Sequence, residues 1–238
     1  MKRILYITNL PSPYKVDFFN ELSNSYEITV VCERQSAKDR DKRWIAKEHH
    51  NFKLTILNGF SVGNEGSLSL EIFKYVLMPF DAVIVNGYSS LTMLIAISFL
   101  NLLKRPYIIA CDGMVMRDKS IKETIKSIIL KKAALCLSSW KMNTDALLHC
   151  RVSTDKIREY PFSSMSEKDM LLDVPNRTKA KSDIGCRSKK MILYVGQMIH
   201  RKGVDLLVEA FSELKLENTE LICVGGDSLL QYKYRYCH

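Results

Sequence analysis

The stretch MILYVGQMIHRKGVDLL, residues 191–207, joins a short apolar run, a glycine and the start of a helix. Ile192 to Val195 are apolar and end at Gly196, which predicts a buried strand followed by a tight turn. Apolar residues then recur at helical spacing from Val204 to Leu214. A strand, a turn and a helix in this order predict one parallel βαβ unit, and hence an α/β fold.

Two cations stand at the beginning of this predicted helix. Arg201 and Lys202 lie at or just before its first turn, where unpaired N–H groups and the helix dipole favour a phosphate. Cations there oppose the dipole by roughly 0.3–1 kcal/mol each, so a bound anion explains them better than solvation. The adjacent His200 is expected to be a lone exposed residue outside catalysis. A second strand, Leu221 to Val224, ends at Gly225, so two strand ends are expected to face one ligand.

Strand-like and helix-like segments alternate along the first 160 residues. Strands are expected at Arg3–Thr8, Glu27–Cys32, Lys53–Leu57, Ala82–Val85, Tyr107–Cys111, Ala134–Leu137 and Lys156–Tyr160. Helices are expected at Val16–Leu22, Leu68–Leu77, Leu91–Leu103, Ile121–Lys132 and Thr144–Cys150. This alternation predicts a parallel sheet that is covered by helices on both faces.

The composition becomes polar after residue 160 and loses its periodicity. We therefore expect a complete domain at residues 1–162, a linker with one short helical piece at 163–190, and an incomplete domain at 191–238. The last part offers two strands and one helix. Its tail, Gln231 to His238, is expected to add no strand, so the second sheet keeps an open edge.

These segments resemble the family 4 glycosyltransferases, whose two Rossmann-like domains face each other across a cleft in the GT-B fold. In that family a G-[RQ] pair, a K-G pair and a V-G-G turn hold the donor diphosphate. The matching residues here are Gly196-Gln197, Lys202-Gly203 and Val224-Gly225-Gly226. The resemblance assigns Gly196, Lys202 and Gly225 to the donor diphosphate, and the place of Arg201 at the helix start adds that residue to the same site.

The N-terminal half carries the same resemblance. The turn that runs from Asn9 to Leu22 is similar to the cleft loop of bacterial surface-polysaccharide transferases, which places Asn9, Pro13 and Tyr14 on the acceptor side. Further matches are Arg43-Trp44, Cys111-Asp112-Gly113, Lys156-Ile157 and Tyr160-Pro161-Phe162. The resemblance covers nearly the whole chain and stops where the family's E-x7-E carboxylate pair is expected.

The resemblance implies transfer of a sugar from a nucleotide-diphosphate donor to a lipid-linked surface polysaccharide, with retention. No cofactor is expected besides the nucleotide sugar, which is a co-substrate. The open alternative is a truncated remnant that binds but does not catalyse. Because both walls of the cleft position the reactants, we expect residues 1–238 to be inactive or barely active.

Asp112 is the candidate catalytic residue, because it follows a predicted strand at the sheet edge where ligands of such folds bind. Its carboxylate would accept a hydrogen bond from a sugar hydroxyl or act as a base. A structural Asp-Gly turn with Gly113 is an equal alternative. Asp39-Arg40-Asp41 matches a metal-binding D-x-D pattern, but its mixed-charge surroundings favour a solvated loop and no metal.

Composition narrows the remaining function classes. The net charge of +9 is dispersed and lacks any nucleic-acid-binding signature, so anionic lipid or a diphosphate substrate explains it better. The first expected strand, Arg3–Thr8, is followed by Asn9 to Pro13 and not by the dinucleotide-binding motif G-x-G-x-x-G. This argues against a dehydrogenase. Seven unclustered cysteines indicate buried thiols in a reducing cytoplasm.

Membrane contact is expected to be peripheral at most. The longest apolar segment, Leu91 to Leu103, is too short to span a bilayer and predicts a buried helix. Residues 114–132 carry six basic and two acidic residues with a stripe of isoleucines. That helix either rests its basic face on anionic headgroups of the inner membrane surface or covers the sheet with a solvated basic face.

Overall fold

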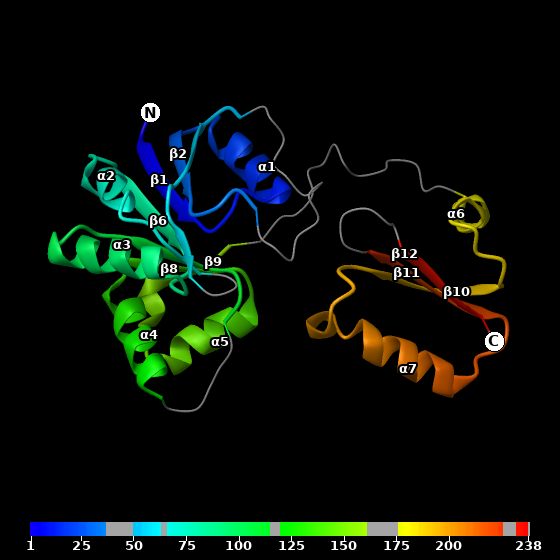
Figure 1. Cartoon of the computed structure of the whole chain (residues 1–238). Helices are drawn as coiled ribbons and strands as arrows, with labels where there is room; N and C mark the ends of the chain where they lie inside the picture. The colour runs from blue at the N-terminus through cyan, green and yellow to red at the C-terminus, as the bar shows by residue number, and fades with distance from the viewer. Residues whose placement is uncertain (37–49, 63–65, 115–119, 161–175, 226–231, 238) are drawn as a thin grey trace. The chain divides into compact units, whose positions relative to one another are not determined.

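The computed structural model describes residues 1–36, 50–62, 66–114, 120–160, 176–225 and 232–237 (Figure 1). Contacts between Cα atoms divide the chain into two compact units. The described residues up to 160 belong to one, here called the N-terminal unit, and those from 176 onward form the C-terminal unit. Each unit has its own sheet.

The N-terminal unit is built on a seven-stranded sheet in the order β3-β2-β1-β6-β7-β8-β9. Every neighbouring pair in it is parallel. The strands are β1 (Arg3–Thr8), β2 (Glu27–Cys32), β3 (Lys53–Ile56), β6 (Ala82–Asn86), β7 (Ile108–Cys111), β8 (Leu135–Ser138) and β9 (Ile157–Glu159). The predicted parallel α/β sheet is confirmed, and its strand order reverses between β1 and β6.

Helices cover both faces of this sheet. They are α1 (Pro13–Leu22), α2 (Ile72–Leu77), α3 (Leu91–Leu102), α4 (Ile121–Lys132) and α5 (Lys141–His149), with a 3-10 turn η1 (Thr154–Lys156). Side chains of α2, α3, α4 and α5 share one buried cluster with Leu5 and Ile7 of β1. Val16 and Phe19 of α1 pack with the alternate residues of β1 in a second cluster. The alternate side chains of β1 therefore contribute to both cores.

Local sequence signals explain where these helices begin. Pro13 occupies the first turn of α1, where its missing N–H costs nothing, so α1 starts three residues before the expected Val16. Ser90 caps α3 by accepting from the N–H of Met93. Helix α3 packs into the core on one face, whereas Leu91 and Leu102 are exposed, so the predicted buried helix is confirmed for that face only.

The expected helix at Leu68–Leu77 is only partly right, because just Ile72–Leu77 is helical. The preceding residues form an antiparallel pair of strands, β4 (Phe60–Val62) and β5 (Gly66–Leu68). A Cβ atom on Gly66 would lie 2.6 Å from the carbonyl oxygen of Val62, so a glycine lets the strands approach. Thr92 accepts a hydrogen bond from the N–H of Ser69, which ties the end of the hairpin to α3.

The C-terminal unit carries a three-stranded sheet in the order β10-β11-β12. Its elements are α6 (Arg177–Asp183), β10 (Lys190–Val195), the 3-10 turn η3 (His200–Lys202), α7 (Val204–Leu214), β11 (Thr219–Gly225) and β12 (Tyr232–Cys237). Strand β12 pairs antiparallel with β11, so the prediction that the tail adds no strand is wrong. Tyrosines at 232, 234 and 236 alternate with other residues, and this period-two pattern is the signal that predicts a strand.

The expected burial of β10 is also wrong. The exposed fractions of Ile192, Leu193 and Val195 are 38%, 48% and 71%. The reason is that β10 pairs only with β11 among the described residues, which leaves it at the edge of the sheet. Helix α7 covers the sheet through Phe211, which packs against Leu221 and Cys223.

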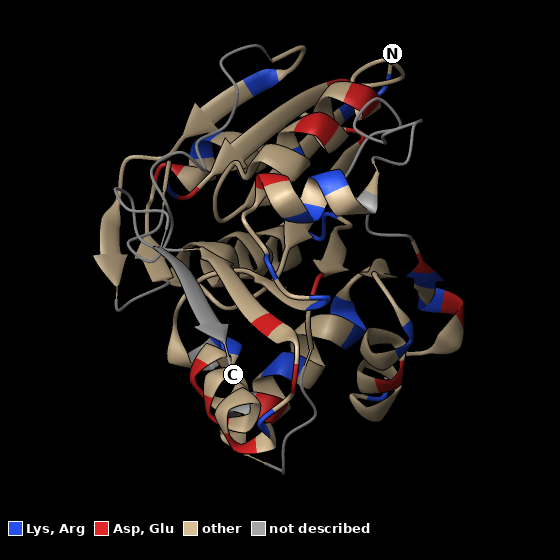
Figure 2. Cartoon of the chain, turned by 90° about the vertical axis from the view of Figure 1, so that its right-hand side faces the viewer, with Lys and Arg blue, Asp and Glu red and all other residues tan. Residues whose placement is uncertain are grey.

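Among the described helices, none combines the length and the apolar character that a bilayer crossing requires. The described residues contain no group of three or more His, Cys, Asp or Glu side chains arranged to hold a metal ion. Asp39, Arg40 and Asp41 lie outside the described residues. Lys and Arg are interspersed with Asp and Glu in both units (Figure 2).

The six cysteines whose side chains the structure describes are free thiols. Five of them are buried and Cys186 is half-buried. Burial raises the pKa of the Cys32 thiol to about 12 and that of Cys136 to about 11. Cys32 and Cys136 are therefore protonated, unreactive thiols near neutral pH.

Candidate functional site

The predicted site residues gather at the carboxyl ends of parallel strands, once in each unit. In the C-terminal unit the turns after β10 and β11 are in direct contact. The N–H of Gly196 donates to the carbonyl oxygen of Val224 at 2.9 Å. A Cβ atom on Gly225 would lie 1.7 Å from the carbonyl oxygen of Gly196, so only glycine fits there. The structure thus brings Gly196 and Gly225 together.

The turn η3 and the beginning of α7 complete this edge of the C-terminal unit. Gly203 joins them in the left-handed conformation, with a φ of 68° that glycine adopts most easily. Lys202 lies in the turn just before α7, where the sequence predicted it, and its side chain is exposed. The backbone of Arg201 belongs to the same turn, and its side chain lies outside the described residues.

His200 is exposed, as predicted, but it has a partner. Its Nδ1 atom lies 2.5 Å from Oδ2 of Asp205, in the first turn of α7. The hydrogen bond with His200 lowers the pKa of the Asp205 carboxyl. Asp205 therefore already supplies a negative charge that the positive end of the α7 dipole favours. A bound phosphate would therefore lie at the same end of α7 as the Asp205 carboxylate. The sequence pattern did not predict this arrangement.

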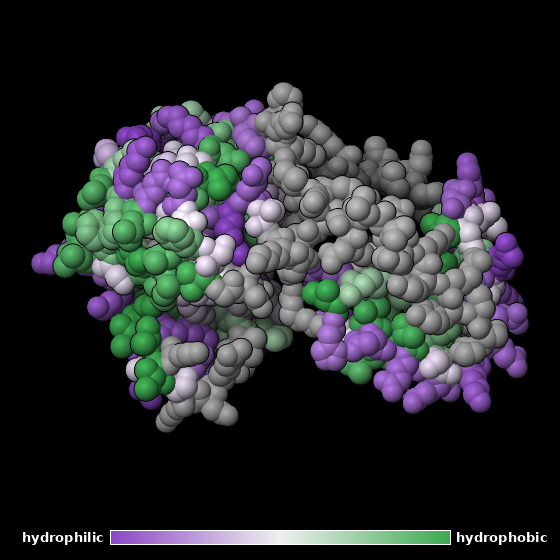
Figure 3. Space-filling view, in the orientation of Figure 1, coloured by the Kyte–Doolittle hydropathy of each residue, from purple (hydrophilic) through white to green (hydrophobic). Residues whose placement is uncertain are grey.

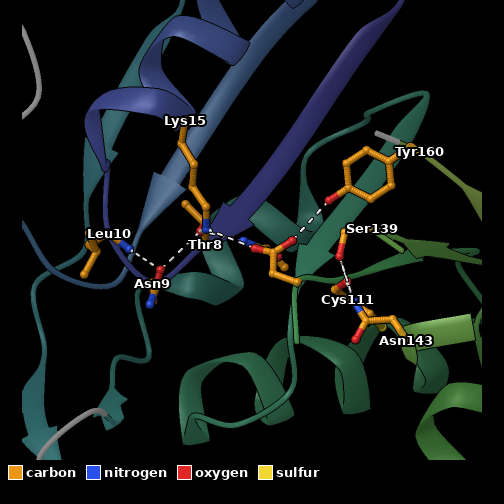
Figure 4. Close-up of polar contacts among 10 residues, drawn as sticks. Thr8, Asn9, Leu10, Lys15, Cys111, Ser139, Asn143 and Tyr160 are labelled. Atoms are coloured by element: carbon orange, nitrogen blue, oxygen red, sulfur yellow. Dashed lines mark hydrogen bonds and ion pairs between the residues drawn. The ribbon is translucent and has the colours of Figure 1, made fainter. Parts of the chain in front are cut away.

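In the N-terminal unit, Lys15 and Asp112 form an ion pair at the carboxyl edge of the sheet. Lys15 lies in the first turn of α1, and its Nζ atom is 3.5 Å from Oδ2 of Asp112, after β7. The same Nζ donates to Oγ1 of Thr8 at 3.0 Å, and Asn86 Nδ2 donates to that oxygen at 3.2 Å (Figure 4). Thr8 and Asn86 end β1 and β6, the strands at which the sheet order reverses, where ligands of such sheets bind.

The second carboxylate oxygen of Asp112 is held by a tyrosine. Tyr160, after β9, donates its hydroxyl proton to Oδ1 of Asp112 at 3.1 Å (Figure 4). Burial, reinforced by the charge of Asp112, raises the pKa of the Tyr160 phenol well above its usual range. Burial, with Tyr160 and Asp112 nearby, also raises the pKa of Tyr6 on β1. Both phenols therefore stay neutral, and Tyr160 donates its proton to the Asp112 carboxylate.

Asn143, rather than Asp112, holds the turn that follows β7. Its Oδ1 accepts from the N–H of Met114 at 2.8 Å, and its Nδ2 donates to the carbonyl oxygen of Cys111 at 2.9 Å. Ser139 donates to the same carbonyl at 3.3 Å (Figure 4). These contacts fix the Asp-Gly turn from outside, so Asp112 is not needed for the shape of that turn.

The three acceptor-side residues have different surroundings. Asn9 Oδ1 accepts from the N–H of Leu10 at 2.8 Å, so this side chain stabilises its own turn (Figure 4). Pro13 sets the start of α1. Tyr14 lies close enough to Tyr160 to contribute to the raised pKa of that phenol. Tyr14 thus comes near the Asp112 group, and Asn9 is linked to it through Thr8, whose hydroxyl donates to Asn9 Oδ1 at 3.4 Å.

Sequence reasoning did not identify Lys15, Thr8, Tyr160 or Asn143 as parts of this site. A signal for Lys15 was present, because a cation in the first turn of a helix opposes the dipole, as argued for Lys202. Tyr160 and Asn143 carried no such signal, since their place depends on which strands lie side by side.

Known proteins are similar to this chain in two ways, one in the sequence of the C-terminal unit and one in the fold of nearly the whole chain. Residues 176–236 match the family model described as glycosyl transferases group 1. No curated protein sequence matches the chain. The matched segment contains both contacting glycine turns and the η3–α7 junction.

Solved structures with similar folds extend over nearly the whole chain. HepE from Anabaena in complex with UDP is 13% identical, with a TM-score of 0.65 over 95% of this chain and 61% of HepE. A glycosyltransferase from Rickettsia africae ESF-5 is 16% identical, with a TM-score of 0.59 over 94% of this chain and 60% of that one.

UDP-N-acetylglucosamine 2-epimerase from Rickettsia bellii is 15% identical, with a TM-score of 0.56 over 94% of this chain and 62% of the epimerase. The chain thus spans about three fifths of the length of these proteins. At these identities the likeness shows the fold, which is of the GT-B type, with Rossmann-like units.

Proposed function

We propose that this protein is a glycosyltransferase of family 4 that moves a sugar from a nucleotide-diphosphate donor to a saccharide. The observation that carries the proposal is the match of residues 176–236 to glycosyl transferases group 1, over a segment whose two glycine turns are in contact. HepE, which has a similar fold, was solved with UDP and with UDP-glucose.

The C-terminal unit would hold the donor diphosphate. Because Gly196 and Gly225 have no side chains, a diphosphate could approach the backbone closely at the two strand ends. The N-terminus of α7 also favours an anion. Lys202 and Arg201 would offset the charge that develops on the leaving diphosphate. In this proposal the cations and the backbone N–H groups stabilise that charge, and no metal is required.

The N-terminal unit would present the acceptor. Asp112 would accept a hydrogen bond from a sugar hydroxyl or take its proton, while Lys15 and Tyr160 hold the two carboxylate oxygens in place. Asn9, Pro13 and Tyr14 would form the loop beside it. We propose a lipid-linked surface polysaccharide as acceptor, transfer with retention, and a cytoplasmic location at the inner membrane surface.

Two other functions use the same fold. One is a binding domain without turnover, and the other is a sugar-nucleotide epimerase, because a UDP-N-acetylglucosamine 2-epimerase has a similar fold. Calorimetric titration with a panel of nucleoside diphosphates would establish donor binding. Incubation of the 238-residue chain with UDP-glucose or UDP-N-acetylglucosamine, with and without a saccharide acceptor, would then separate the three functions.

Each outcome of this experiment is distinct. A sugar added to the acceptor, with release of the nucleoside diphosphate, supports the transferase. A change of configuration in the nucleotide sugar without acceptor supports the epimerase. Nucleotide binding with neither product supports the non-catalytic domain, and absence of nucleotide binding contradicts the proposed donor site.

A further inference from the structure

An exposed tryptophan lies at the same edge of the sheet as the Asp112 group. The exposed fraction of Trp140 is 55%. Figure 3 shows apolar side chains scattered over the surface of both units, so exposure alone does not mark a site. The place of Trp140 in the sheet distinguishes it. Asp112 and Tyr160 follow β7 and β9, and Trp140 follows β8, the strand between them.

The end of β8 is tied to both partners of the candidate catalytic carboxylate. Cys111, directly before Asp112, pairs with Ser138 at the end of β8. The N–H of Tyr160 donates to the carbonyl oxygen of Ser138 at 2.9 Å, while its hydroxyl donates to Asp112. Trp140 comes two residues after Ser138. The carboxyl ends of three neighbouring strands thus bring Asp112, Trp140 and Tyr160 to one edge.

The backbone of Trp140 is held firmly. Its carbonyl oxygen accepts three hydrogen bonds, from the Ser138 hydroxyl at 3.0 Å and from the N–H groups of Asn143 and Thr144 at 3.0 Å and 3.2 Å. The Asn143 side chain also donates to the carbonyl oxygen of Cys111. The turn that carries Trp140 and the loop that carries Asp112 are therefore linked, so their spacing is preorganised.

Helix stability does not explain a tryptophan at this position. Trp140 is the N-cap residue of α5, and its side chain makes no capping hydrogen bond. Ser, Thr, Asp and Asn are preferred there, because a side-chain oxygen accepts from an N–H of the first turn. Ser90 and Ser120 do this for α3 and α4. An indole that neither caps the helix nor enters the core departs from local preference, as functional side chains often do.

We propose that Trp140 binds the acceptor by stacking on one face of its pyranose ring. A hexopyranose presents axial C–H groups on a ring face, which pack on an aromatic surface, and hydroxyl groups around its rim. Trp140 would hold the ring, and Asp112 would receive one hydroxyl. This inference rests on the proposed sugar transfer, and it names the side chain that selects a pyranose as acceptor.

The nucleobase of the donor is another ring that could stack on an indole. The acceptor fits Trp140 better for two reasons. The contacting glycine turns that suit a diphosphate belong to the C-terminal unit, whereas Trp140 belongs to the N-terminal unit. The side chains tied to the end of β8 include a carboxylate and a phenol, which are groups that bind sugar hydroxyls.

Tryptophan fluorescence would test the proposal directly. The chain has two tryptophans, so in the Trp44→Phe variant the emission comes from Trp140 alone. The methyl β-D-pyranosides of glucose, galactose and N-acetylglucosamine are the probes. At least one should shift the emission to shorter wavelength and protect the indole from quenching by acrylamide, because the sugar covers an exposed ring. Sorbitol, a polyol without a ring, and UDP should do neither.

The variant Trp140→Ser separates binding from folding. Serine is a good N-cap residue, so the urea midpoint of the N-terminal unit should stay the same or rise. Affinity for the pyranoside, measured by ligand-observed NMR titration, should fall at least about fivefold. Trp140→Phe should recover part of the affinity. Tyr26→Ala is the matched control, because it removes a 36% exposed aromatic ring just before β2, at the opposite edge of the sheet.

Three results would overturn the proposal. These are an unchanged emission with all three pyranosides, an equal response to sorbitol, and equal pyranoside affinity of the wild type and Trp140→Ser. A response to UDP alone would assign the indole to the nucleobase. UDP binding without a pyranoside response would refute the role of Trp140 and leave the proposed transferase intact. A pyranoside response without UDP binding would refute the transferase and keep the sugar site.

Discussion

Lys15 Nζ lies 3.5 Å from Oδ2 of Asp112, and it joins the first helix of the N-terminal unit to the loop after β7. Thr8, at the end of β1, accepts from the same ammonium group. The Lys15 side chain is only 10% exposed, so little water screens its side of the pair. The candidate catalytic carboxylate is thus positioned by a cation from another element of the fold.

Lys15→Met should destabilise the N-terminal unit by about 1–2 kcal/mol. The substitution removes the cation beside Asp112 and the donor to Thr8, and the one-third exposure of Asp112 limits the loss. Lys141→Met is a matched control, because its pair with Asp145 is surface-exposed and should contribute no more than about 0.5 kcal/mol. Urea unfolding measures both, and equal stabilities of the two variants would contradict the role of Lys15.

Gly225→Ala should destabilise the C-terminal unit by more than about 2 kcal/mol, because the new Cβ atom would meet the backbone of Gly196. Hydrogen exchange of the β10 and β11 amides would detect the loss. Gly113→Ala is the control, since a Cβ there has no neighbour within 4 Å, and its effect should stay within about 0.5 kcal/mol. Unchanged exchange in the Gly225 variant would show that the two turns are not in contact.

Lys202→Ala should weaken the binding of a nucleoside diphosphate by roughly 10- to 150-fold, which corresponds to the loss of one charge-assisted contact of about 1.5–3 kcal/mol. Isothermal titration calorimetry measures the dissociation constants. Lys189→Ala, which removes an exposed lysine before β10, should bind like the wild type. Equal constants for Lys202→Ala and the wild type would refute the donor site.

Glu33 should make the stability of the N-terminal unit fall as pH rises. This carboxyl follows β2 and is 4% exposed, and burial raises its pKa although the Ser90 hydroxyl bonds to it. A raised pKa in the fold means that the protonated form is favoured. The resulting stability is complete below the unfolded pKa of about 4.3 and is lost as pH rises through the folded value.

Glu33→Gln should remove this part of the pH dependence while it keeps a partner for Ser90. Unfolding free energies measured in urea from about pH 4 to pH 7 should therefore fall less steeply in the variant than in the wild type. The two profiles would run parallel if Glu33 were ionised in the fold throughout this range.

Individual elements show what short-range pattern predicts and where it fails. The apolar run of β1 and the capped helix α4 have the predicted bounds, because their signals lie within a few residues. The hairpin β4–β5 and strand β12 were missed although Gly66 and the alternating tyrosines marked them. The apolar composition of β10 predicted a buried strand. Its burial depends, however, on which strands lie beside it, and a local sequence pattern does not predict that.

The sequence by itself determined the parallel α/β fold, the glycine turns after β10 and β11, and the cations before α7. These follow from periodicity, backbone freedom and helix polarity, which are local properties. Only the tertiary structure decided that Lys15, Asp112 and Tyr160 meet, and that the isoleucines of α4 face outward. The physical reason is that strand order and helix rotation are set by packing between segments far apart in the chain.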